Sequence, residues 1–98
     1  METALNNKIY YNVGKKLSEK IVSIQELNKL SREVSNYLMY AAKDEKMRVK
    51  LFITIMDFLA LRRISIPSGF VEGIMQTDER ELTLNVGLFI EGLSSVKR

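Results

Sequence analysis

The sequence predicts a small all-α bundle of four or five helices with short connections. Apolar residues recur at helical spacing along much of the chain, and residues typical of helix N-termini stand between the apolar stretches. The chain of 98 residues also contains one proline and no low-complexity segment. A chain of this length usually has one hydrophobic core, so we expect residues 1–98 to form a single helical domain.

The first two helices are predicted from apolar residues that fall on one face. In residues 4–21 these residues stand four apart: Leu5, Ile9, Val13, Leu17 and Ile21. Ser23 and Glu26 then form an S-x-x-E capping box, which opens a helix over about 24–43. This second helix has the clearest amphipathic stripe in the chain: Leu27, Leu30, Val34, Tyr37, Leu38 and Ala41.

The densest apolar stretch, residues 47–63, is predicted to be the third helix. Asp44 can cap it, whereas the alternation expected of a strand fails at Phe52 and Met56. As a helix the stretch has one narrow polar line: Lys46, Lys50, Thr54 and Asp57. Its apolar surface is then wider than neighbouring helices are expected to cover, which indicates a partner for the 47–61 helix.

The C-terminal third allows two interpretations. Ser68 can cap a short helix over 69–76, and Asp78 with Glu81 gives a start signal for a helix over 79–92. Apolar residues also alternate through 82–90, as they would in a strand. The alternative is therefore an α+β fold with a C-terminal β-hairpin that pairs 70–75 with 82–90.

The composition excludes several kinds of active site. The chain has no cysteine and no histidine, so it cannot form disulfides, zinc sites built on these residues, or Ser-His and Cys-His nucleophilic centres. Asp57 is expected to mark the edge of a buried face. Asp78, Glu79 and Glu81 are expected to stabilise a helix N-terminus rather than to bind a metal ion. We therefore expect no catalytic residues, no enzyme activity, no cofactor and no metal.

The sequence also indicates that the protein does not span a membrane. The apolar run from Leu51 to Leu61 is much shorter than the roughly 20 residues that cross a bilayer. The N-terminal residues lack the pattern of a signal peptide. A cytoplasmic location is the expectation.

The strongest functional signal comes from aromatic and methionine side chains outside a single core face. Such side chains are typical of surfaces that bind other proteins. They predict a partner interface formed by Tyr11, Met39, Tyr40, Phe52, Met56 and Leu59. The expected function is that of a small regulator, adaptor or chaperone that presents a helical apolar surface to a protein partner. A homodimer is the expected assembly.

The charge distribution suggests an alternative function. The net charge is +3, and residues 1–50 hold ten of the 15 Lys and Arg residues. A basic patch can bind the phosphate backbone of nucleic acids. The alternative is therefore a nucleic-acid-binding regulator that uses a cluster around 43–50: Lys43, Lys46, Arg48 and Lys50. Two acidic residues, Asp44 and Glu45, lie inside this cluster and weaken it.

Overall fold

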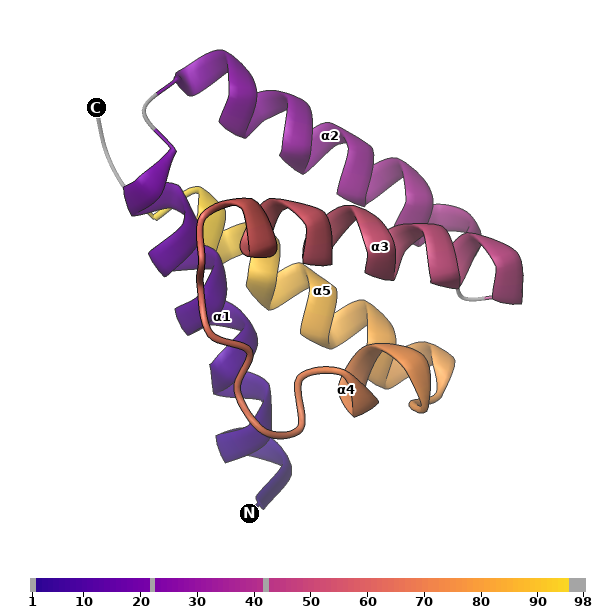
Figure 1. Cartoon of the computed structure of the whole chain (residues 1–98). Helices are drawn as coiled ribbons and strands as arrows, with labels where there is room; N and C mark the ends of the chain where they lie inside the picture. The colour runs from indigo at the N-terminus through magenta and orange to yellow at the C-terminus, as the bar shows by residue number, and fades with distance from the viewer. Residues whose placement is uncertain (1, 22, 42, 96–98) are drawn as a thin grey trace.

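The computed structural model of the protein describes residues 2–21, 23–41 and 43–95. Within these ranges the chain forms five helices and no strand (Figure 1): α1 (Glu2–Lys20), α2 (Ile24–Ala41), α3 (Glu45–Leu61), α4 (Glu72–Met75) and α5 (Glu79–Leu93). The predicted all-α bundle is confirmed. The α+β alternative is wrong, because residues 82–90 lie inside α5.

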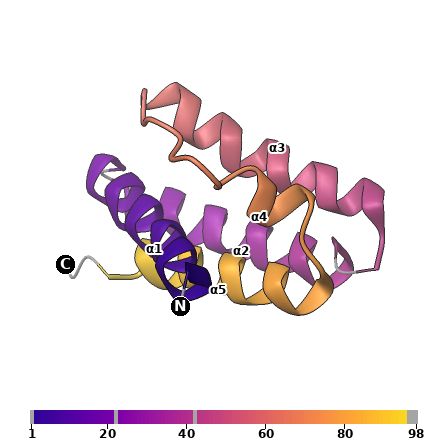
Figure 2. The same ribbon diagram turned by 90° about the horizontal axis from the view of Figure 1, so that it is seen from below.

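The helices pack mainly in two pairs, α1 with α5 and α2 with α3. Seen from below, α3 forms one side of the molecule and α5 the other, and α2 and α4 lie between them (Figure 2). The connection from α3 to α4 runs back along α1 before it turns into α4 (Figure 1). This path brings residues from opposite parts of the sequence next to each other.

Three helices begin at the capping residues that the sequence predicts. Ser23, Asp44 and Asp78 each accept a hydrogen bond from a backbone N–H in the first turn that follows, at 3.2, 2.9 and 2.8 Å. These bonds satisfy donors that a helix leaves unpaired at its start. The starts of α2, α3 and α5 therefore follow from local sequence chemistry.

The start of α4 differs from the expectation of a helix over 69–76 capped by Ser68. The helix begins at Glu72, and Val71 at its N-cap provides no side-chain hydrogen bond. Gly69 has φ +89°, a left-handed conformation that interrupts a helix. This turn directs Phe70 into the core, where its ring stacks on Tyr10 at a centroid distance of 4.7 Å.

Burial along α3 corrects the expectation of a largely uncovered apolar surface. Leu51, Ile55 and Leu59 are fully buried, and Phe52 and Met56 are half-buried and packed against the core. The bundle thus covers the residues that were expected to need a partner. The large apolar side chains of α3 that remain exposed are Val49, Ile53 and Leu61.

Helices α1 and α5 approach each other closely at Gly14 and Gly92. A side chain at Gly14 would collide with the backbone carbonyl of Phe89, and one at Gly92 with the backbone carbonyl of Tyr11. Glycine at these positions lets the two backbones pack directly against each other. Among the helices described, none is both long enough and apolar enough to cross a bilayer.

Candidate functional site

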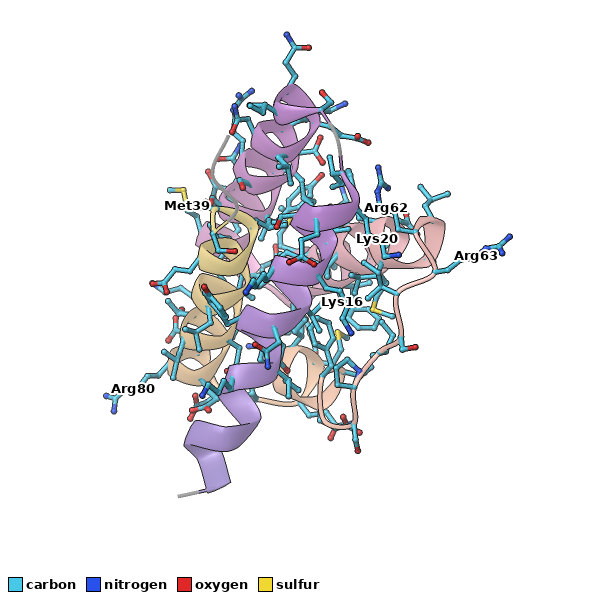
Figure 3. The ribbon with its side chains drawn as sticks, turned by 90° about the vertical axis from the view of Figure 1, so that its left-hand side faces the viewer. Lys16, Lys20, Met39, Arg62, Arg63 and Arg80 are labelled. Atoms are coloured by element: carbon cyan, nitrogen blue, oxygen red, sulfur yellow. The ribbon has the colours of Figure 1, made fainter. Side chains whose placement is uncertain are left out.

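An open groove of about 690 Å³ lies between the C-terminal half of α2 and the N-terminal half of α5. Side chains from both helices line it: Ser35, Leu38, Met39, Glu79, Arg80, Thr83 and Leu84. Figure 3 shows Met39 and Arg80 on the same side of the molecule. Two helices that are separate in the sequence therefore contribute to one concave surface.

A second hollow of about 430 Å³ continues along the end of α2 toward the start of α3. It is lined by Met39, Tyr40, Lys43, Asp44 and Met47. Met39 belongs to both hollows, so they form one continuous surface. We call the two sets of lining residues together the docking groove.

The groove exposes large apolar side chains to an unusual degree. Met39 is 72% exposed, Tyr40 58% and Leu84 47%. A contiguous apolar surface on a small protein marks a binding site more often than isolated exposed residues do. Methionine and tyrosine suit protein partners, because the methionine side chain is flexible and the tyrosine ring carries a polar hydroxyl.

Charged side chains also line the groove. Glu79 and Arg80 lie at the start of α5, and Lys43 and Asp44 lie between α2 and α3. Each of these two segments thus carries one acidic and one basic side chain. An apolar floor with a charged border is the usual composition of a protein interface.

The structure gathers some of the six predicted interface residues and separates the others. Met39 and Tyr40 lie in the groove, whereas Tyr11 is half-buried on α1. Phe52 and Met56 are half-buried on α3 and do not line the groove. These three residues therefore contribute little surface to a partner.

Leu59 does not belong to any surface. It is fully buried, because it lies four residues after Ile55 and eight after Leu51 on the stripe of α3 that faces the core. Its prediction as a partner residue is corrected by this burial.

The predicted nucleic-acid cluster is also divided. Lys43, Lys46 and Lys50 are exposed, but Arg48 is half-buried. The Nη1 of Arg48 donates a hydrogen bond of 2.6 Å to the backbone carbonyl of Thr77. Arg48 thus holds the segment before α5 against α3, and its side chain is committed to the fold.

Sequence reasoning missed the contribution of α5 to the groove. Leu84 lies off the stripe that Leu82, Val86 and Phe89 form toward the core, just as Met39 lies off the stripe of α2. Its position outside the core-facing stripe is the sequence signal that could have identified Leu84 as a groove residue. In the sequence alone, Leu84 also fits the strand alternation of the alternative interpretation, which obscures this signal.

The described residues include no group of three or more acidic, histidine or cysteine side chains that could hold a metal ion. The acidic residues near the start of α5 belong to the helix N-terminus and to the border of the groove. Asp78 caps the helix, and Glu79 lies in its first turn and at the border of the groove.

Comparison with models of known protein families, with curated proteins and with solved structures finds no match to this chain.

Proposed function

We propose that this protein is a small, non-enzymatic interaction module that binds a protein partner in its docking groove, as a regulator, adaptor or chaperone does. The exposure of Met39 between two adjoining hollows is the observation that carries the proposal. Covering this side chain removes a large apolar area from water, which is the main source of free energy in protein association.

The simplest partner is a second copy of the chain. Two-fold symmetry brings the same surface of both copies together. The groove carries both signs of charge, with Lys43 and Asp44 in one lining segment and Glu79 and Arg80 in another. A surface with both signs of charge can pair with a copy of itself without a net repulsion, which favours a homodimer.

Sedimentation equilibrium of the pure protein at micromolar concentration tests this proposal. We expect a reversible dimer in the wild type. The variant Met39→Lys places a charge where both hollows meet, and should shift the protein toward the monomer. The fold should be preserved, because Met39 is an exposed residue of α2.

Ile53→Lys is the matched control. It makes the same kind of change at an exposed apolar residue of α3 that does not line the groove. The dimer should persist in this variant. A wild type that stays monomeric throughout, or a dimer that Ile53→Lys disrupts and Met39→Lys does not, would contradict the proposal.

A further inference from the structure

Four basic side chains gather on the side of α1 away from the docking groove. They are Lys16 and Lys20 near the end of α1, and Arg62 and Arg63 just after α3. Figure 3 shows all four on one side of α1, whereas Met39 and Arg80 lie on the other. We call these four residues the basic corner.

The path of the chain after α3 brings these residues together. Lys16 lines a small hollow with Ser65 and Pro67, which places α1 directly beside the connection. Lys20 follows Lys16 by one helical turn, about 6 Å along the axis, and projects from the same side of α1. The sequence separates Lys20 from Arg62 by more than forty residues, so no local pattern could reveal this cluster.

The side chain of Arg62 is held in place. Its Nη2 donates to the carboxylate of Glu26 at 2.8 Å, and its guanidinium lies over the ring of Phe58, 5.3 Å from the centroid. The ion pair offsets its charge but leaves other N–H donors of the guanidinium available. Arg62 therefore supplies a fixed donor at the edge of the corner.

Arg63 occupies a backbone position that favours glycine. Its φ is +56°, and its N–H donates to the carbonyl of Ala60 at 3.1 Å. The N–H of Ile64 donates to the carbonyl of Leu59 at 3.0 Å, which completes a Schellman motif at the end of α3. The left-handed position of this motif is usually glycine, so an arginine there has a conformational cost without an evident gain in packing, because its side chain is exposed.

Interaction with helix dipoles explains the positions of only two of the four basic residues. Lys20 in the last turn of α1 and Arg62 at the end of α3 complement the negative helix termini. Lys16 lies more than a turn from the end of α1, and Arg63 lies beyond α3. Glu19, the neighbouring acid on α1, lies about 100° round the helix from Lys20.

We propose that the basic corner binds the phosphate backbone of double-stranded nucleic acid without reading its sequence. Lys16, Lys20 and Arg63 have no ion-pair partner among the described residues, so their charges are available to phosphates. Lys16 and Lys20 lie one helical turn apart on one edge, so both can contact the regularly spaced phosphates of a backbone. This site is distinct from the docking groove and from the cluster at 43–50.

The surface around the corner favours duplex nucleic acid over two other anionic partners. Single strands are bound by exposed aromatic rings that stack on bases, and the one strongly exposed aromatic ring among the described residues, Tyr40, lies in the docking groove. A membrane surface is bound by several strongly protruding apolar side chains together with cations. Near the corner only Leu61 is more than half exposed, at 77%, and Ile24 at the start of α2 is 48% exposed.

Fluorescence anisotropy with a labelled duplex DNA, measured over a range of salt concentrations, tests the proposal. For three to four phosphate contacts we expect micromolar binding at low salt and a slope of about −3 in log affinity against log salt concentration. In Lys16→Glu/Lys20→Glu the affinity should fall by about tenfold or more, and the slope should become shallower by about 2.

Lys46→Glu/Lys50→Glu is the matched control, because it reverses two exposed lysines one turn apart on α3 and changes the net charge equally. This variant should lose about threefold or less in affinity, the effect of net charge alone. Arg63→Gly should weaken binding while the melting temperature stays the same or rises, which separates loss of the contact from loss of the fold.

Three results would overturn the proposal. The first is a wild type that does not bind duplex at low salt. The second is an equal loss in the two double variants, or a larger loss in the control, which would assign binding to net charge or to the cluster at 43–50. The third is binding to phosphatidylserine vesicles with no binding to duplex, which would make the corner a membrane site.

Discussion

At the scale of single residues, Tyr10 connects α1 to the turn before α4. Its hydroxyl donates a buried hydrogen bond of 2.6 Å to the carbonyl of Phe70, and its ring stacks on the ring of the same residue. Gly73 leaves room for the hydroxyl, because a side chain there would collide with it. One side chain thus fixes the position of the connection that carries Arg63 and Ser65.

Replacing Tyr10 by phenylalanine should show how much this hydrogen bond contributes to the free energy of unfolding. The variant leaves the buried carbonyl of Phe70 without its short partner, which costs about 1–3 kcal/mol. Urea unfolding should report a loss of this size. No change in the free energy of unfolding would mean that water replaces the hydroxyl.

Tyr10 also predicts a dependence of stability on alkaline pH. Burial raises the pKa of Tyr10 well above its ordinary value of 10.0, and the negative charges of Glu72 and Glu81 raise it further. The unfolded chain therefore loses this proton at a lower pH than the folded chain. The contribution of Tyr10 is complete below pH 10 and is lost as the pH rises above it. The advantage of the wild type over Tyr10→Phe should shrink above pH 10, and parallel pH profiles for the two proteins would contradict this assignment.

Arg63 gives the second prediction at this scale. Glycine adopts a positive φ without the clash that other residues have there, although it gains freedom in the unfolded chain. Arg63→Gly should therefore raise the free energy of unfolding by about 1 kcal/mol or less. A lower stability, measured by urea unfolding, would mean that the arginine side chain stabilises the fold by contacts of its own.

At the scale of helices, the contact between α1 and α5 depends on the absence of side chains at the crossing. Gly14→Ala should push the two backbones apart, because the obstacle is the backbone of Phe89 and cannot rotate away. We expect a loss of about 2 kcal/mol or more in the free energy of unfolding.

Gly87→Ala is the control for this prediction. Gly87 also lies in α5, but a side chain there would meet nothing within 4 Å. Alanine favours the helix over glycine, so this variant should gain up to about 1 kcal/mol. Equal effects of the two substitutions would show that helix propensity, and not the crossing, sets the stability.

The helices were largely predictable because their signals are local. Asp44 and Asp78 act as caps in the folded chain as the sequence predicts, since their hydrogen bonds reach only two or three residues ahead. Ser68 was wrongly predicted as a cap, because the conformation of Gly69 and the burial of Phe70 decide that turn and both depend on the rest of the fold.

At the scale of the whole molecule, two binding surfaces are proposed on different sides. The docking groove joins α2 to α5, and the basic corner joins α1 to the end of α3. Met39 and Tyr40 could be identified from their position outside the stripe of α2. The proximity of Met39 to Leu84, and that of Lys16 to Ser65, could not be predicted, because packing between distant segments creates both.

The most direct test of the central proposal is to map the protein's own association surface by nuclear magnetic resonance. Backbone amide signals are recorded as the protein is diluted from high to low concentration. We expect concentration-dependent shifts at Met39, Tyr40 and Leu84, and none at Val49 and Ile53, because the first three lie in the groove and the others on the outer face of α3. Shifts confined to α3, or no shift over the whole range, would contradict the assignment of the groove as the surface that binds a second copy.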